Sequence, residues 1–308
     1  MVSTSKQSKC CAIIVTYNAS KWIDQCLSCL SQSSYHISVI IVDNNSTDNT
    51  LEIINEKYKP DQVIELEENL GFGKANNVGI EYGYSQGYEY FFLLNQDAYV
   101  DDDCIKYLID SISSKPEIGI LSPIHLNGKG DDLDRGFKAG IKSKQFVNDY
   151  SQNKWSTDLY QVPFVNAAAW MIRRATLEKV GLFHPLFFHY GEDKNYVARV
   201  KNVGLKIKVD RFASIRHDRE NRGYNPLLKE PYKNHAREAW QILLNPSNPS
   251  NYYSLLTAAI WNMLVVSSRW NFRRRKEFIV NNIKSFKTKY VEMQKFGGRH
   301  YNPLSKAK

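Results

Sequence analysis

Residues 37–50 read ISVIIVDNNSTDNT, an apolar run that ends abruptly in polar residues. Its first part, 37–42, is short, continuous and rich in Ile and Val, which is typical of a strand buried on both faces of a parallel sheet. Asp43 ends this strand, and Asp48 is placed to cap a helix that we predict to run through Tyr58. A buried strand, a polar turn and a helix in this order are the repeating unit of an α/β fold.

The same unit recurs on both sides of this stretch. Strands are predicted over residues 12–16, 37–42, 63–66 and 90–94, with helices near 21–31, 51–58 and 74–85 between them. This order implies a parallel sheet with right-handed crossovers, in which ligands bind beyond the carboxyl ends of the strands. Polar residues gather at those ends, namely Thr16, Tyr17, Asn18, Asp43, Asn44, Asn45, Asn95, Gln96 and Asp97.

The rest of the chain has a less regular pattern. Residues 127–160 show no clear period and are expected to form a mobile loop or hairpin. Strands are predicted over 162–165, 170–172 and 205–209, and helices over 175–180 and 192–202. Because the pattern becomes helical beyond about residue 226, we expect an α/β domain over 1–225 and a helical, basic extension over 226–308.

Composition and charge narrow the classes of partner. A chain of 308 residues with 43% hydrophobic and 24% charged residues is typical of a folded globular protein. The net charge of +9 is concentrated in residues 269–308, where 12 Lys and Arg face only Glu277 and Glu292. A local excess of this kind favours an anionic membrane surface over a nucleic-acid groove spread across the fold. The oligomeric state stays open, with a homo-oligomer as one alternative.

Three further features of the sequence indicate where in the cell the protein acts. Residues 1–9 are polar with no apolar run, so we expect no secretory signal. The five Cys favour reduced thiols over a zinc site, because Cys26 and Cys29 have no second pair. The stretch 251–268 has no charged residue, but its Asn, Ser and Thr favour a helix packed on the body or lying in the membrane interface over a span. We therefore expect a cytoplasmic protein, peripheral at the inner face of the cell membrane.

Several side chains suit the transfer of a sugar from a nucleotide diphosphate. The reaction needs a nucleotide pocket, stabilisation of the leaving diphosphate and a base for the acceptor hydroxyl. Asp43 is placed to accept from the nucleotide base or only to cap its own turn, and Asp97 offers a hard oxygen to Mg²⁺ or Mn²⁺. Glu192–Asp193 either supplies the base or stabilises a helix start. His217 lies among arginines that suit a diphosphate.

In this order along the chain, the motifs resemble the family 2 glycosyltransferases, inverting enzymes with the GT-A fold. The branch that includes rhamnosyltransferases is the most similar. The resemblance covers about residues 10–220. It rests on IIVTYN at 13–18, VDNNSTD at 42–48, the Asn and Gly pattern at 69–80, NQD at 95–97 and Glu192–Asp193.

The resemblance implies a donor that is a nucleotide diphosphate-sugar, a Mg²⁺ or Mn²⁺ ion, and a glycan or lipid-linked glycan acceptor in surface polysaccharide assembly. It assigns Asp193 as the general base, Glu192 as the residue that orients acceptor or base, and Asp97 with His217 to the metal. The donor-binding residues expected are Thr16, Tyr17, Asn18, Asp43, Asn45, Asn69, Gly71, Phe72, Lys74, Asn77, Asn95 and Gln96. The acceptor contacts expected are Trp170, His189 and Tyr190.

Two positions depart from the family pattern. Asn95 stands where the metal motif commonly has its first Asp, and Asn76 where many relatives have Arg. Lys74, or the arginines at 216, 219 and 222, are candidates to supply the missing charge. A nucleotidyltransferase and a dehydrogenase are disfavoured, because the turn after the first strand lacks their Gly-rich loops. A non-catalytic scaffold remains as the alternative, although it would need neither Asp97 nor Asp193.

Overall fold

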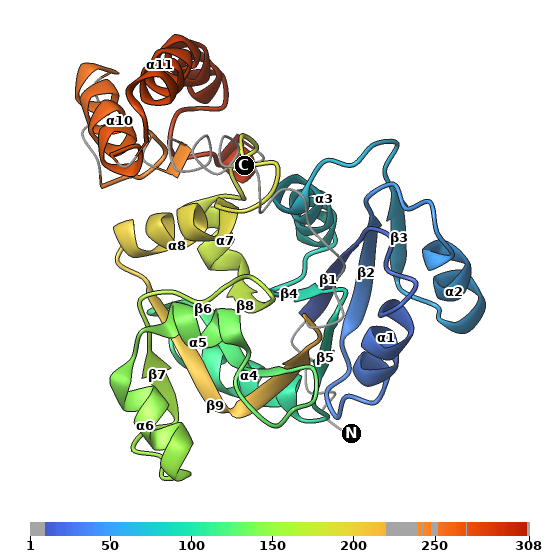
Figure 1. Ribbon diagram of the computed structural model, residues 1–308. Helices are drawn as coiled ribbons and strands as arrows, with labels where there is room; N and C mark the ends of the chain where they lie inside the picture. The colour runs from blue at the N-terminus through green and yellow to red at the C-terminus, as the bar shows by residue number, and fades with distance from the viewer. Residues whose placement is uncertain (1–9, 220–239, 242, 248–251, 269, 307–308) are drawn as a thin grey trace.

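The computed structural model describes residues 10–219, 240–241, 243–247, 252–268 and 270–306. The expected order of alternating strands and helices is confirmed in its first part. The elements there are β1 (Cys10–Thr16), α1 (Ile23–Ser31), β2 (Ser38–Asp43), α2 (Thr50–Lys57), β3 (Gln62–Glu65), α3 (Phe72–Ser85) and β4 (Tyr90–Asn95). The strands lie in the order β3-β2-β1-β4 and pair in parallel, so their carboxyl ends share one edge of the sheet (Figure 1).

The second part extends the same sheet with strands of mixed direction. Its elements are β5 (Ala98–Val100), α4 (Cys104–Ser113), β6 (Ile118–Asn127), α5 (Arg135–Ile141), α6 (Lys144–Gln152), β7 (Leu159–Gln161), β8 (Ala169–Arg173), α7 (Arg174–Val180), α8 (Glu192–Asn202) and β9 (Lys206–His217). The sheet continues from β4 as β8-β6-β9-β5, and β7 pairs with β9. Strand β8 runs antiparallel to both β4 and β6. The result is an α/β fold with a mixed, mostly parallel sheet.

Two predictions for the middle of the chain are wrong. Residues 127–160 contain α5 and α6 rather than only a mobile loop or hairpin, and Phe137 and Phe146 of these helices are fully buried. Each helix is short and starts with a side-chain cap, Asp134 for α5 and Ser143 for α6, so the apolar period was too brief to detect. The strand predicted over 162–165 lies at Leu159–Gln161 instead.

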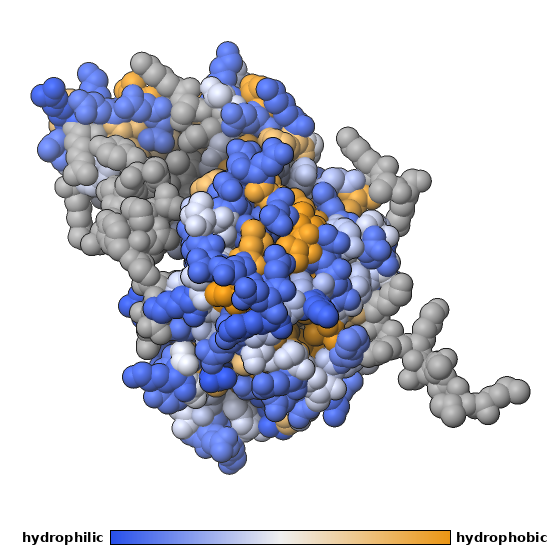
Figure 2. Space-filling model, turned by 90° about the vertical axis from the view of Figure 1, so that its right-hand side faces the viewer, coloured by the Kyte–Doolittle hydropathy of each residue, from blue (hydrophilic) through white to orange (hydrophobic). Residues whose placement is uncertain are grey.

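The core consists of two hydrophobic layers, one on each face of the sheet. Strand β1 shows why its sequence is apolar throughout: Ala12 and Ile14 enter the layer under α1 and α4, whereas Cys11 and Ile13 enter the layer under α3, α7 and α8. Strand β3 forms one edge of the sheet. Figure 2 views the molecule from the side of β3 and α2, where hydrophobic side chains gather in the middle of a mainly hydrophilic face.

The C-terminal region is helical, as expected. Helices α10 (Tyr252–Val266) and α11 (Phe272–Lys295) pack side by side, and a short 3-10 helix, η2 (Pro303–Lys306), follows (Figure 1). The predicted domain boundary at residue 225 lies outside the described residues. Among the residues that are described, no helix combines the length and apolar character needed to cross a membrane.

Candidate active site

The polar residues at the strand ends lie next to one another because of the sheet register. Thr16 pairs with Asp43 across β1 and β2, and Val15 pairs with Asn95 across β1 and β4. Three motifs from distant parts of the sequence therefore meet at one edge of the sheet, as the strand order predicted.

Asp43 organises the turn that follows β2. The Thr16 hydroxyl donates to Asp43 Oδ1 at 2.7 Å, and the Ser46 hydroxyl donates to the same oxygen at 2.6 Å. The Ser46 amide donates to Asp43 Oδ2 at 2.8 Å. The carboxylate is almost fully buried, so the turn-capping role that the sequence left open is present. Its role toward a nucleotide base remains a prediction.

The turn after β1 is fixed by side chains from neighbouring motifs. The Tyr17 amide donates to Gln96 Oε1 at 2.8 Å, and the Thr47 amide donates to Asn18 Oδ1 at 2.9 Å. Asn18 and Asn45 both adopt left-handed backbone conformations, with φ of 49° and 68°, which Asn tolerates better than most residues. These bonds leave the Tyr17 ring 47% exposed beside the strand ends.

Asn44, which the sequence argument did not single out as a binding residue, holds the glycine loop in place. Its Nδ2 donates to Asn69 Oδ1 at 2.9 Å, and its Oδ1 accepts from the Leu70 amide at 2.8 Å. Asn69 Oδ1 also accepts from the Gly71 amide. The signal was available in the sequence, because a buried Asn directly after a strand needs partners for both ends of its amide.

Gly71 brings the glycine loop against the segment that precedes α8. Its φ is +80°, and a Cβ at this position would lie 1.8 Å from the Phe188 carbonyl oxygen. A Cβ at Gly73 would lie 3.2 Å from the Phe183 side chain and 3.5 Å from that of Glu192, which is a tight but ordinary contact. Only a residue without a side chain allows the approach at Gly71, so this glycine joins two motifs more than 100 residues apart in sequence.

Asp97 and His217 meet at the junction of β5 and β9. The Nε2 atom of His217 lies 3.4 Å from Asp97 Oδ1, and both side chains are almost fully buried. Asn95 Nδ2 lies 3.5 Å from the same Nε2 atom. The Oδ1 atom of Asn95 is buried and has no hydrogen-bond partner.

This cluster is a candidate site for a divalent cation. Within the described part of the chain, no group of three or more His, Cys, Asp or Glu side chains is arranged to hold a metal ion. Asp97 offers a carboxylate and the unpartnered Asn95 Oδ1 a neutral amide, and His217 Nε2 would add an imidazole ligand if the ring carried its proton on Nδ1 in place of the bond from Arg219. Such a set leaves several coordination positions for the oxygens of a bound diphosphate.

Arg219 and Asp134 adjoin this cluster, and Asp134 was not predicted. Arg219 Nε lies 3.0 Å from Asp134 Oδ2 and donates to His217 Nδ1 at 3.2 Å. Asp134 is buried and also caps α5 by accepting from the Phe137 amide. Of the arginines suggested for the missing charge, Arg219 therefore lies at the metal cluster, Arg216 extends over the Tyr99 ring, and Arg222 is outside the described residues.

Asp193 stands in the first turn of α8, after a strained piece of backbone. Tyr190 has a φ of 67° and Gly191 a φ of 101°, so the chain reverses directly before the helix. Asp193 is half-buried, and burial raises the pKa of its carboxyl above the usual range despite opposing effects of the Lys194 amide and of Arg219. A carboxylate destabilised in this way is a stronger base. Glu192 is buried beside it against Gly73.

Two residues that were expected to contact ligands, Trp170 and Asn77, occupy core positions instead. Trp170 is fully buried and packs on Phe183 and Tyr196, so its ring is not accessible to an acceptor. Asn77 is buried, and its amide bonds to both the carbonyl and the amide of Phe183, so it fastens α3 to the segment before α8. Both residues therefore stabilise the packing around the candidate site.

The other expected residues have different positions. Phe72 is half-buried and meets the edge of the Phe183 ring at 6.0 Å, and Lys74 is half-buried in the first turn of α3. Asn76 is buried and donates to the Phe72 carbonyl within its own helix, so no charge is supplied there. The rings of His189 and Tyr190 are in contact, with centroids 4.0 Å apart, on the loop that leads to Asp193.

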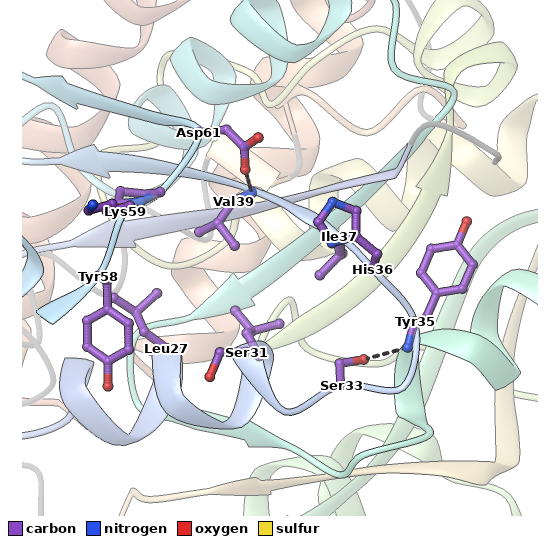
Figure 3. A pocket seen from close by; sticks show the side chains of 12 residues that line it. Leu27, Ser31, Ser33, Tyr35, His36, Ile37, Val39, Tyr58, Lys59 and Asp61 are labelled. Carbon is purple, nitrogen blue, oxygen red and sulfur yellow. Dashed lines mark hydrogen bonds between the residues drawn. The ribbon is translucent and has the colours of Figure 1, made fainter.

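A cavity of about 250 Å³ lies where β2 and β3 begin, at the end of the sheet opposite the carboxyl ends of the strands (Figure 3). It is formed by the end of α1, the start of β2 and the segment before β3. Its walls include Tyr35, His36 and Lys59, and Asp61 accepts a hydrogen bond from the Val39 amide there. None of the predicted site residues lines it. It is thus separate from the cluster at the carboxyl ends of the strands.

The sequence of residues 11–181 matches the profile of Glycosyl transferase family 2. A similar characterised protein is the N-acetylglucosaminyl-diphospho-decaprenol L-rhamnosyltransferase of Mycobacterium tuberculosis, 24% identical over 70% of this chain and 78% of that protein. The poly-beta-1,6-N-acetyl-D-glucosamine synthase of Staphylococcus epidermidis is 33% identical, but over 36% of this chain and only 27% of the synthase. This second match therefore spans about a quarter of its relative.

Solved structures show the same fold. S. aureus TarS (residues 1–349) aligns over 90% of this chain and 80% of its own with a TM-score of 0.59 and 15% identity. GalNAc-T7, solved with UDP, GalNAc and Mn²⁺, aligns over 91% of this chain and 58% of its own with a TM-score of 0.57 and 16% identity. These likenesses show the fold alone. Because the family profile covers more than half of the sequence, the chain belongs to Glycosyl transferase family 2 and is a glycosyltransferase.

Proposed function

We propose that this glycosyltransferase moves a sugar, with inversion, from a nucleotide diphosphate donor to a hydroxyl of a lipid-linked glycan. The observation that carries the proposal is the meeting of three motifs at one place: the strand-end polar residues, the Asp97–His217 cluster and the loop of Asp193. The contact of Gly71 with Phe188 supports placing donor and base together.

The donor side is formed by the turns after β1, β2 and β4. Thr16 and Asp43 are already joined by a hydrogen bond, so a nucleotide base would meet a fixed pair rather than two mobile side chains. The exposed Tyr17 residue offers a surface for the base, and the close backbone contact of Gly71 with Phe188 brings the glycine loop next to the segment that leads to Asp193.

Asp97, His217 and the Asn95 amide oxygen are the residues that would hold Mg²⁺ or Mn²⁺. When bound, such an ion stabilises the negative charge of the leaving diphosphate. Arg219 adds a fixed positive charge at the same place, because Asp134 and His217 hold its guanidinium. This positive charge supports departure of the diphosphate. Asn95 and Asn76, which are neutral, contribute no charge of their own.

Asp193 would take the proton from the acceptor hydroxyl as the oxygen attacks the sugar. An inverting transfer needs no protein nucleophile, since attack and departure occur on opposite faces of the sugar. The raised pKa of Asp193 suits this task, and the buried Glu192 would orient the base or acceptor. His189 and Tyr190, on the adjoining loop, are the proposed acceptor contacts.

The acceptor and the sugar are inferred from the relatives and from charge. The rhamnosyltransferase relative acts on a diphospho-decaprenol-linked sugar, which supports a lipid-linked acceptor and makes rhamnose a candidate sugar. The basic residues in 269–308 support a position at an anionic membrane surface on its cytoplasmic side.

Calorimetry with nucleoside diphosphates and their sugars, each with and without Mn²⁺ or Mg²⁺, tests the proposal. We expect one nucleotide to bind selectively and to bind more tightly with the ion. Asp97→Ala should remove the effect of the ion, whereas Asp110→Asn, an exposed Asp on α4, should leave it unchanged. Failure of the folded wild type to bind any nucleotide would contradict the proposal and favour a scaffold role.

A further inference from the structure

Helix α10 has an uncharged sequence and buries only one side. Its 15 residues, YYSLLTAAIWNMLVV, contain no Asp, Glu, Lys or Arg. Leu255, Ala259 and Met263 are buried and lie in the hydrophobic cluster shared with Phe278 and Phe286 of α11. Their four-residue spacing places them along one face, so this face is the one that packs against α11.

The opposite face of α10 exposes three large apolar side chains. Tyr253, Trp261 and Val265 lie at multiples of four residues, with the exposed Thr257 between the first two, and they are 76%, 70% and 55% exposed. Phe272, the first residue of α11, is 82% exposed at the turn between the two helices. Large apolar side chains with this exposure along one helix usually mark an interaction surface. We call Tyr253, Trp261, Val265 and Phe272 the α10 stripe.

Basic residues lie next to the turn that ends the stripe. Arg273 and Lys276 are exposed, and the Arg273 side chain is 92% accessible. Glu277 lies 3.5 Å from Arg273 in a solvent-exposed pair that holds it only weakly. Arg275, in contrast, donates to the Leu264 carbonyl and so joins the two helices. Positive charge beside an exposed aromatic stripe is complementary to an anionic lipid surface.

We propose that the α10 stripe inserts into the interfacial layer of an anionic bilayer, with Arg273 and Lys276 among the lipid headgroups. The inference rests on the proposed function in one respect, that a lipid-linked acceptor is reached at a membrane. Tyr and Trp prefer the boundary between headgroups and acyl chains, and a helix of 15 residues lies in that layer rather than crossing the bilayer.

Vesicle sedimentation with full-length protein tests the apolar contacts. We expect binding to vesicles of phosphatidylglycerol and phosphatidylcholine, weakened at least tenfold in the double variant Trp261→Ser, Phe272→Ser, because each ring loses its burial in lipid. Phe212→Ser is the matched control, since Phe212 is 46% exposed on β9 and outside the stripe. The double variant should unfold near the wild-type temperature, since both of its side chains are at least 70% exposed. Equal binding by all three proteins would overturn the proposal.

Charge reversal tests the headgroup contacts. Arg273→Glu with Lys276→Glu should weaken binding to anionic vesicles several-fold per charge, and the loss should shrink at high salt. Lys106→Glu on α4, also an exposed position, is the control. Deletion of residues 269–308 would be a poor test, because it removes buried Phe278, Phe286 and Met293.

Two further outcomes are decisive. If light scattering shows a dimer that Trp261→Ser dissociates, and vesicles are not bound, the stripe is a contact between two copies and the lipid proposal is wrong. Nucleotide calorimetry on the same variants separates the two proposals. Stripe-dependent vesicle binding without any nucleotide binding would contradict the proposed function and leave the lipid surface standing.

Discussion

The proposed active site has a donor half and an acceptor half, and the two are held in different ways. On the donor side, residues of the strand-end motifs bond to one another: Thr16 to Asp43, and Asn44 to Asn69. On the acceptor side, the loop before Asp193 is held by segments distant in sequence. Asn77 of α3 clamps Phe183, and Phe187 is buried in the cluster of α10 and α11.

The C-terminal segment adds to the support of the acceptor side. The Tyr301 carbonyl accepts from the Leu182 amide at 3.2 Å, and the His184 ring lies 3.0 Å from the Gly298 carbonyl. Asn302 donates to the Glu178 carbonyl at 2.9 Å. The turns of the donor half are therefore held by bonds among motifs within residues 16–97, whereas the acceptor half depends on contacts with segments as distant as residue 302 and should be the more sensitive to remote changes.

The largest effect is expected from a change to Asp193, the proposed base in the acceptor half. Asp193→Asn should lower turnover by about 10²-fold or more with donor binding retained. Because burial raises the pKa of Asp193, the charged form costs stability at neutral pH. The variant should then unfold at the same or a higher temperature at pH 7, and this advantage should vanish below the ordinary Asp range near pH 4. Near-normal turnover would remove Asp193 as the base.

The next largest effect is expected in the pH dependence of stability, through His184, whose ring contacts the C-terminal segment. Burial lowers the pKa of His184 to about 4, below the usual value of about 6.5 for an unfolded chain. Protonation therefore favours unfolding, and about 3 kcal/mol of stability should be lost as the pH falls from about 6.5 to about 4. Urea unfolding of His184→Gln should lack this loss. A variant with the same pH dependence as the wild type would contradict the assignment.

A third prediction concerns the contact that joins the two halves. Gly71→Ala should destabilise the protein by about 2 kcal/mol more than Gly204→Ala. Both glycines have a φ near +80°, but Gly71 also has a ψ of 170°, a conformation that is essentially restricted to Gly, and a Cβ there meets another backbone, at Phe188. Chemical denaturation measures the difference. Equal destabilisation would mean that the loops separate at little cost.

The smallest effect is expected in ion binding at the donor half. Asn95→Asp adds a carboxylate to the Asp97–His217 cluster and should tighten Mn²⁺ binding about tenfold in the presence of nucleoside diphosphate. Asp110→Asn again serves as the control for a change of surface charge. Weaker ion binding would show that the buried amide oxygen is not directed at the ion site.

The contrast between the halves also explains what the sequence could predict. The strand ends, the order of β1 to β4 and the positions of Asp43 and Asp97 follow from periodicity and the rule for parallel sheets. Asp134 and the burial of Trp170 depend on α5 and on how β8 inserts between β4 and β6, which short-range patterns do not encode. The burial of Phe187 likewise depends on partners that lie more than 50 residues further along the chain, which no local pattern indicates.

The bonds between Leu182, Glu178 and residues 301–302 have a consequence for the order in which the protein matures. During synthesis, the bonds among the turns after β1, β2 and β4 and the glycine loop need only residues up to Gln96, whereas His217 joins Asp97 once β9 has been made. The segment that positions Asp193 gains its last partners only after residue 302 has been added. A nascent chain should therefore acquire nucleotide binding before it can transfer a sugar.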